Sequence, residues 1–115
     1  MGKRKSVDIK HFHVEDWSMA PTYIPGDCID VDAQTHSYRV PSPGDIVVVK
    51  DPEMRGRKLL KRVQKVVHVS GRTMVFVSGD NELRSRDSRQ FGPIPADEIV
   101  GRVLDAETKQ RKRRI

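Results

Sequence analysis

Short runs of β-branched residues, each ended by turn-forming residues, constrain the fold of this chain more than any other feature. In these runs valine, isoleucine and threonine cluster or alternate with polar residues, which is the pattern of β-strands. Proline, glycine and aspartate interrupt them, as in "YIPGD", "VPSPGD" and "VSGR". We find no amphipathic helix pattern and no internal repeat. The sequence therefore predicts a mostly β fold with strands at residues 9–15, 28–33, 45–50, 58–69, 73–79 and 98–104.

A single small domain is expected, because 115 residues can form a modest core but not two independent ones. No apolar run is long enough for a transmembrane helix or a secretory signal, so we expect a soluble protein without a membrane anchor. The lone cysteine, Cys28, can form no disulfide within the chain, which fits a reducing cytoplasm.

The formal net charge of +6 is concentrated at the two ends of the chain. Of 22 lysines and arginines, three lie at residues 3–5 and five at residues 109–114, which leaves 14 against 16 acidic residues. We therefore predict a folded domain at residues 8–107 between basic tails at 1–7 and 108–115. Such tails are usually solvated, with weak attraction to acidic surfaces, RNA or anionic lipid as the functional alternative. Aromatic residues are few, so the domain lacks an obvious platform for stacking bases, and nucleic acid is not a predicted partner.

Ser18 lies in the stretch "DWSMAPTYIPGD", residues 16–27, between a predicted strand and a proline-bearing turn. An isolated serine in such a place usually ends a strand through local hydrogen bonds. A nucleophilic serine would need an exposed hydroxyl, backbone N–H groups that stabilise an oxyanion, and a base within hydrogen-bond reach. A catalytic role for Ser18 therefore depends on finding that base.

Histidine and lysine are the candidate bases. No histidine lies in a stretch typical of a Ser-His-Asp site, and His11 and His13 share a strand face without a suitably spaced third ligand, so no metal or cofactor is predicted. In "LLKRV", the strand period of two places Leu59, Lys61 and Val63 on one face. Substantial burial there could lower the pKa of the lysine toward neutrality. Taken alone, however, Lys61 would be a solvent-facing strand lysine.

Residues 79–95, "GDNELRSRDSRQFGPIP", form a polar segment that is too long for a simple hairpin. Loops of this kind inside compact domains often carry function. Together with "SMAPT" at 18–22, "GDIVVV" at 44–49 and "LLKRV" at 59–63, its first part strongly resembles the type I signal peptidase family. These are serine proteases with a Ser-Lys dyad on a mostly β catalytic fold. The resemblance covers roughly residues 14–103 and implies a compact signal-peptidase or LexA-like catalytic β fold.

Carried over residue by residue, the resemblance implies that Ser18 attacks the scissile carbonyl and that Lys61 takes its proton. The backbone N–H of Ser18 would stabilise the oxyanion, and Ser85 would orient the lysine through a hydrogen bond. The other implied site residues are Met19 and Pro21 at the substrate pocket, Gly79, Asp80 and Asn81 in the turn that shapes the site, and Asp87 and Arg89 as an ion pair that holds the loop.

Two residues depart from the family pattern. Two positions before the nucleophile, where the family often has a small residue and sometimes a hydroxyl that completes the oxyanion hole, this chain has Asp16, and Trp17 replaces the usual glycine. A carboxylate aimed at a developing oxyanion would repel it. Asp16 must therefore turn away, take up a proton or serve another role.

Without an anchor or the large accessory β domain of bacterial signal peptidases, the chain most resembles the soluble nickel-type superoxide dismutase maturation proteases. These trim a short N-terminal extension from the dismutase. The resemblance therefore implies a precursor protein with such an extension, the nickel superoxide dismutase precursor, as the partner, and the cytoplasm as the location. LexA-like peptidases also use a Ser-Lys dyad, but they cleave themselves after a DNA-binding domain, for which this chain has no room.

Two other functions stay open. One is removal of signal peptides at the membrane, with the basic tails or a partner protein supplying peripheral attachment. The other is a non-catalytic binding module whose basic tails contact nucleic acid.

Overall fold

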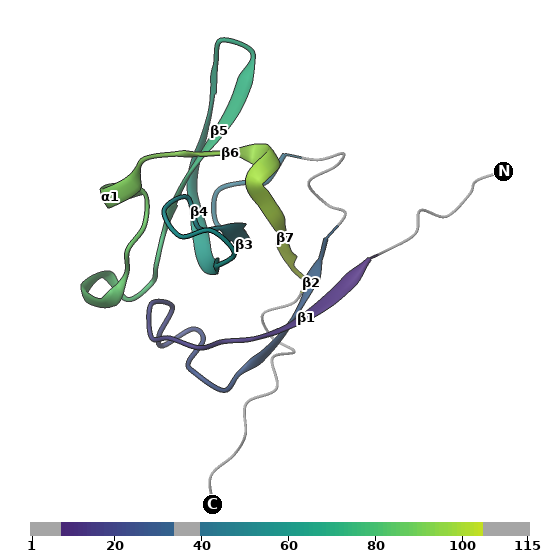
Figure 1. Cartoon of the computed structure of the whole chain (residues 1–115), viewed down its shortest axis with the longest axis vertical. Coiled ribbons are helices and arrows are strands. Elements are labelled where there is room, and N and C mark those ends of the chain that lie inside the picture. The colour runs from purple at the N-terminus through teal and green to yellow at the C-terminus, as the bar shows by residue number, and fades with distance from the viewer. Residues whose placement is uncertain (1–7, 34–39, 105–115) are drawn as a thin grey trace, which may run out of the picture.

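The described part of the chain forms one antiparallel sheet of seven strands in the order β1-β2-β7-β3-β4-β5-β6 (Figure 1). The computed structural model describes residues 8–33 and 40–104, so the two predicted basic tails lie outside the described residues. The strands are β1 (Ile9–His13), β2 (Cys28–Asp32), β3 (Ile46–Lys50), β4 (Lys58–Val69), β5 (Arg72–Ser78), β6 (Ile94–Pro95) and β7 (Ile99–Val103). The prediction of a mostly β fold is confirmed.

The predicted strands agree with the observed ones to within two residues at each end. The strand predicted at 9–15 ends earlier, at His13, because Val14 exchanges backbone hydrogen bonds with the turn at Gly26 and Asp27, both at 2.9 Å. The two-residue strand β6 lies in the segment that was predicted to be loop alone. Among the described residues there are also three short helical turns: η2 (Glu82–Arg84), α1 (Ser88–Phe91) and η3 (Ala96–Glu98). Within the described ranges, no helix has the length and apolar character needed to cross a membrane.

Strand β3 is buried on both faces and separates two apolar clusters. Because side chains alternate between the two faces of a strand, Ile46 and Val48 lie in the first cluster and Val47 and Val49 in the second. The first core cluster consists of Val14, Met19, Tyr23, Ile29, Val31, Ile46, Val48 and Val103. The second core cluster consists of Val47, Val49, Leu59, Val63, Val75, Val77, Ile94 and Ile99. Residues from both ends of the chain thus meet on β3.

The turn "PGD" closes the segment that carries Ser18. Gly26 adopts a φ of 98°, a conformation that favours glycine, and the buried side chain of Asp27 accepts a hydrogen bond from Ile24 N at 2.9 Å. The bonds between this turn and Val14 then make residues 14–27 a closed loop between β1 and β2. At the left of Figure 1, this loop lies beside the segment that follows β5.

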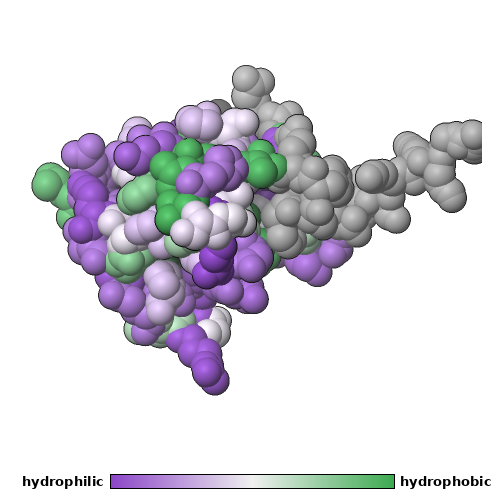
Figure 2. Space-filling model, turned by 90° about the horizontal axis from the view of Figure 1, so that it is seen from above, coloured by the Kyte–Doolittle hydropathy of each residue, from purple (hydrophilic) through white to green (hydrophobic). Residues whose placement is uncertain are grey.

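Hydrophilic side chains cover most of the face seen in Figure 2, and apolar residues form small separate areas there. This agrees with a sequence in which 33% of the residues are charged. The large apolar side chains that are exposed include Trp17, Met54, Val69 and Leu83.

Candidate active site

The nucleophile predicted from the sequence lies in a tightly held turn. Ser18 is only 4% exposed, so the exposed hydroxyl expected of a nucleophilic serine is not observed in this structure. The residues that follow it anchor the turn, because Met19 and Tyr23 are buried in the first core cluster. Backbone hydrogen bonds join Ala20 N to Trp17 O at 3.1 Å and Tyr23 N to Met19 O at 3.0 Å. The position of Ser18 is therefore fixed by packing on one side and by backbone hydrogen bonds within the turn.

Lys61 is buried, in contrast to an ordinary strand lysine. Its residue exposure is 2%, and its neighbours Leu59 and Val63 on the same face of β4 are buried too, as the alternation predicted. Burial lowers the pKa of Lys61 from its ordinary value, because the apolar surroundings disfavour the ammonium form. The carboxylates of Asp16 and Asp87 oppose this effect, whereas the nearby guanidinium groups of Arg86 and Arg57 reinforce it. The net effect is a lowered pKa, so the ammonium of Lys61 loses its proton more easily than that of a free lysine.

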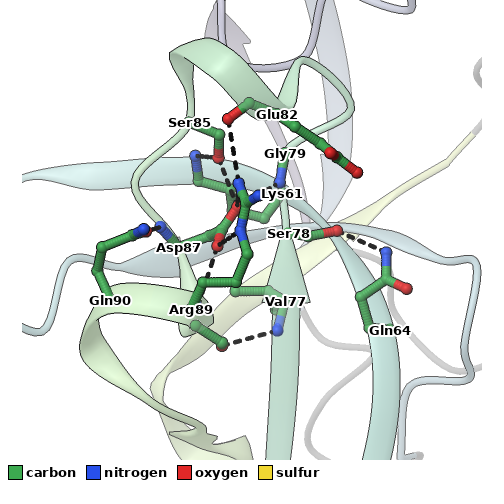
Figure 3. A network of polar contacts seen from close by, with 11 residues as sticks. Lys61, Gln64, Val77, Ser78, Gly79, Glu82, Ser85, Asp87, Arg89 and Gln90 are labelled. Atoms are coloured by element: carbon green, nitrogen blue, oxygen red, sulfur yellow. Dashed lines mark hydrogen bonds and ion pairs between the residues drawn. The ribbon is translucent and has the colours of Figure 1, made fainter.

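A chain of hydrogen bonds connects this lysine to the loop after β5 (Figure 3). Lys61 Nζ donates to Ser85 Oγ at 3.0 Å, and Ser85 Oγ donates to Asp87 Oδ2 at 2.7 Å. Asp87 Oδ2 also accepts from Gly79 N at 2.9 Å. Ser85 therefore orients the amine, and the buried carboxylate orients Ser85.

Asp87 and Arg89, the two residues expected to pair, form a bidentate contact. Arg89 Nε lies 3.0 Å from Asp87 Oδ1, and Arg89 Nη2 lies 3.1 Å from Asp87 Oδ2. Burial alone would raise the pKa of Asp87, but hydrogen bonds from Arg89, Ser85 and the backbone outweigh it and hold this pKa far below its usual range. Asp87 also caps α1, in a capping box with Gln90. A single ionised carboxylate thus organises the loop.

Replacement of Arg89 with alanine should lower activity by about tenfold, the effect usual for a residue that orients a reacting group through another side chain. The buried Asp87 would lose its bidentate partner, so the midpoint of thermal unfolding should also fall. Steady-state kinetics and a melting curve measure the two effects. Arg84→Ala removes an exposed arginine from the same loop and serves as the control. Full activity and an unchanged midpoint in Arg89→Ala would show that the ion pair does not position Ser85.

The turn formed by Gly79, Asp80 and Asn81 joins the loop to the nucleophile segment. Asn81 N donates to Ser18 O at 2.8 Å, and Asn81 Nδ2 donates to Trp17 O at 3.0 Å. Asp80 N lies 3.4 Å from the sulfur of Met19. The predicted turn residues therefore contact the nucleophile segment directly, on its main chain and on the Met19 side chain.

Gly79 occupies a position with no space for a side chain. A Cβ atom there would lie 2.6 Å from Ser18 O and from Ser85 Cβ, and closer still to Ser85 Oγ. The backbone of Ser18 and the side chain of Ser85 thus border the same small space. Four of the predicted site residues, Ser18, Lys61, Gly79 and Ser85, are brought together here.

Two contacts of the site were not anticipated from the sequence. Arg62, next to Lys61 in β4, forms a bidentate contact with Asp80 at 2.9 Å for both hydrogen bonds, and Thr22 donates to the same carboxylate at 2.6 Å. The hydrogen bonds from Arg62 and from Thr22 lower the pKa of Asp80, whereas burial alone would raise it. Arg62 directly follows Lys61 in the motif "LLKRV", and this position is the one feature of the sequence that could have indicated a role for Arg62 at the site.

The second unexpected contact connects the loop after β5 to the segment between β3 and β4. Arg86 pairs with the fully buried side chain of Asp51 and, at 2.6 Å, with Glu53. The partners are more than thirty residues apart in the sequence, and no local pattern marks them. The contact places a permanent cation near Lys61.

A groove of about 780 Å³ runs beside the site. One wall comes from the end of β1 and the residues before Ser18, and the other from residues 54–60, which lead into Lys61. Met19, expected at the substrate pocket, is packed in the first core cluster, so its contribution and that of Pro21 to substrate binding stay predictions.

The carboxylate of Asp16 contacts the backbone N–H that was expected to stabilise the oxyanion. Ser18 N donates to Asp16 Oδ1 at 3.1 Å, while Asp16 Oδ2 lies 3.7 Å from Arg57 Nη2 on the opposite wall of the groove. The sequence left open that the Asp16 side chain turns away from the oxyanion site, and this is not what the structure shows. A serine hydroxyl, a buried amine and a backbone N–H donor are the parts from which acyl-transfer chemistry is built, but in this structure Asp16 occupies the donor.

Comparison with known proteins gives a consistent set of relatives. A family model described as signal peptidase, peptidase S26, matches residues 5–67 and 64–105. The mitochondrial ATP-independent inner membrane protease subunit 1b of Arabidopsis thaliana is 38% identical over 108 residues, which cover 76% of this chain and 63% of the relative. Subunit 1a of that plant is 31% identical, covering 80% and 66%. Signal peptidase I V of Bacillus subtilis is 28% identical, covering 84% of each chain. The chain thus spans less than two thirds of the length of the two plant relatives.

Proposed function

Because the chain belongs to the signal peptidase family, peptidase S26, we propose that it is a serine endopeptidase in which Ser18 and Lys61 form a Ser-Lys dyad. The single observation that carries the proposal is the buried amine of Lys61, which donates to Ser85 at 3.0 Å, while the side chain of Ser85 and the carbonyl oxygen of Ser18 both border the space at Gly79. Burial of a lysine is unfavourable in free energy, and such lysines occur at sites that use the neutral amine as a base.

In the proposed reaction, neutral Lys61 accepts the proton of Ser18 Oγ as this oxygen attacks the scissile carbonyl carbon. The tetrahedral intermediate collapses, the C–N bond breaks, and the ammonium of Lys61 returns the proton to the departing amine. Water then attacks the acyl-enzyme ester in the same way and releases Ser18. Throughout the cycle, the contact between Ser85 and Asp87 supports the orientation of the amine.

The substrate peptide is proposed to bind as an added strand along the first residues of β4. Lys58, Leu59 and Leu60 pair with β3 on one side, whereas pairing of β4 with β5 begins only at Arg62. The other edge of residues 58–60 therefore has backbone groups available next to Lys61, and these residues line the groove. Addition of a strand to such an edge is a common mode of peptide recognition.

The proposed substrate is a precursor protein that loses a short N-terminal extension. Its identification as the nickel superoxide dismutase precursor, with cleavage in the cytoplasm, rests on the resemblance described under Sequence analysis. A second candidate is the removal of targeting segments at a membrane. The names of the relatives favour it, since they are inner membrane proteases and a signal peptidase. The peptidase family does not favour the third alternative, a non-catalytic binding module.

Cleavage assays separate these possibilities. The purified protein is incubated with the nickel superoxide dismutase precursor and, in parallel, with a secretory precursor in the presence and absence of anionic lipid vesicles. Mass spectrometry should find one new amino terminus in the preferred precursor, and Ser18→Ala should produce none. Cleavage of the dismutase precursor alone would favour maturation, whereas cleavage only with vesicles would favour the membrane function. Failure to cleave either precursor would count against the proposed peptidase.

A further inference from the structure

We propose that Asp16 is the gate of the oxyanion site: its carboxylate occupies Ser18 N–H in the peptide-free protein and moves to Arg57 when a substrate carbonyl arrives. The inference rests on the proposed function, because it assumes that Ser18 is the nucleophile. It makes Asp16 a positioning residue that controls when the backbone donor is available.

The geometry supplies both ends of this movement. Asp16 Oδ1 accepts from Ser18 N at 3.1 Å, and Asp16 Oδ2 already lies 3.7 Å from Arg57 Nη2. The side chains of Asp16 and Arg57 are both about half exposed, at 53% and 47%. Since a contact between exposed charged groups is weak, little free energy opposes a shift from one partner to the other.

Competition for a single hydrogen-bond donor explains why the carboxylate must move. The N–H of Ser18 is one donor, and the carbonyl oxygen of a bound peptide needs it most when that oxygen becomes an anion. A carboxylate on the same donor would exclude the carbonyl oxygen and repel its developing charge. Catalysis therefore requires Asp16 to leave, and Arg57 is the cation within reach on the opposite wall of the groove.

The same movement acts on the base. The charged groups that influence Lys61 are Asp16 and Asp87, which favour its ammonium form, and Arg86 and Arg57, which favour the neutral amine. Close pairing of Asp16 with Arg57 weakens the influence of both charges on Lys61, and the influence of Asp16 is the larger of the two. The opening of the oxyanion site therefore eases the loss of the proton from Lys61.

A purely structural role for Asp16 makes a different prediction. An aspartate that accepts from the N–H two residues later can simply close a turn, and an asparagine does the same without a charge. Asp16→Asn therefore keeps the turn and removes only the charge, whereas Asp16→Ala removes both. A structural role predicts normal activity in the first variant and reduced activity in the second.

The test compares kcat and kcat/KM over a range of pH in Asp16→Ala, Asp16→Asn and Arg57→Gln, with Asp30→Ala, an exposed aspartate on β2, as the control. A charge-assisted hydrogen bond is strong enough that freeing the donor should raise kcat by about tenfold in Asp16→Ala. In both Asp16 variants, the alkaline-rising limb of kcat/KM should move to lower pH, because a carboxylate that favours the ammonium of Lys61 is gone. In Arg57→Gln, kcat should fall and the limb should move to higher pH. An unchanged or lower kcat in Asp16→Ala would overturn the gate whether or not the limb moves, because loss of the charge alone can move it.

A peptide aldehyde separates failure of the gate from failure of the proposed function. Such a probe forms a hemiacetal with a nucleophilic serine, and its oxygen takes the position of the oxyanion. Mass spectrometry should locate the adduct on Ser18, and the aldehyde should bind about tenfold more tightly to Asp16→Ala than to the unaltered protein. An adduct of equal affinity in both proteins would refute the gate alone. Absence of an adduct from both folded proteins would refute the nucleophile and, with it, the gate.

Discussion

Replacement of Lys61 with methionine is expected to lower kcat/KM by about four orders of magnitude while the fold persists. Methionine has a similar length and fits the apolar surroundings between Leu59 and Val63, but it cannot accept a proton. Ser18→Ala should cause a comparable loss. The matched control is Lys65→Met, which alters an exposed lysine of the same strand and should retain activity.

Nucleophile and base act as one unit, so the double variant Ser18→Ala, Lys61→Met should be scarcely less active than either single variant. The kcat/KM of the unaltered protein should rise with pH through an apparent pKa below that of a free lysine, because burial lowers the pKa of Lys61. Appreciable cleavage by folded Lys61→Met would mean that another group is the base. Losses that multiply in the double variant would mean that the two residues act independently.

Lys61→Met should also be more stable than the unaltered protein. Because the folded state lowers the pKa of Lys61 from its ordinary value of 10.5, the charged lysine favours the unfolded chain. This cost is fully present below the folded-state pKa and disappears as the pH rises toward 10.5. At neutral pH, the melting temperature of Lys61→Met should therefore lie above that of the unaltered protein. The gain should shrink in alkaline buffer.

Replacement of Gly79 with alanine is the second change with a large expected effect. The added Cβ would lie 2.6 Å from Ser18 O, which is a backbone atom, and 2.6 Å from Ser85 Cβ. Neither can yield without displacing part of the site, and a misplacement of about 1 Å can cost about 100-fold in rate. We therefore expect kcat to fall at least that far, together with a loss of about 1–3 kcal/mol in stability from overpacking.

Gly71→Ala is the control for this experiment. Gly71 has a φ of 80° in the β4–β5 hairpin, so alanine is strained there, but no atom lies within 4 Å of the added Cβ. This variant should lose stability and retain its kcat per folded molecule. If Gly79→Ala behaved in the same way, the crowding at this glycine would have no part in positioning the two serines.

The strands could be predicted because their signal is local. The alternation in "LLKRV" predicts that Leu59, Lys61 and Val63 share one face, and the turn residues mark where the strands end. The burial of Lys61 itself could not be obtained this way, since it depends on elements far along the chain. The contact of Arg86 with Asp51 and Glu53 escaped prediction for the same reason.

Asp16 shows a different limit of sequence reasoning. The chemistry of a carboxylate next to an oxyanion site raised a conflict, and the sequence left three ways to resolve it. The choice between them depends on a side-chain rotation and on the distance to Arg57, a residue on another segment. Only the folded arrangement supplies these two facts.

The two apolar clusters on either side of β3 divide the proposed dyad between them. The turn that carries Ser18 is anchored through Met19 and Tyr23 in the first core cluster, whereas Lys61 lies between two members of the second. Hydrogen bonds from Asn81 to the carbonyl oxygens of Trp17 and Ser18 connect the two sides. A small slip of one half of the domain against the other would separate nucleophile and base before either half lost its strands. Loss of cleavage in mild denaturant should therefore precede loss of the β-sheet spectrum, and activity should report on how well the two halves stay docked.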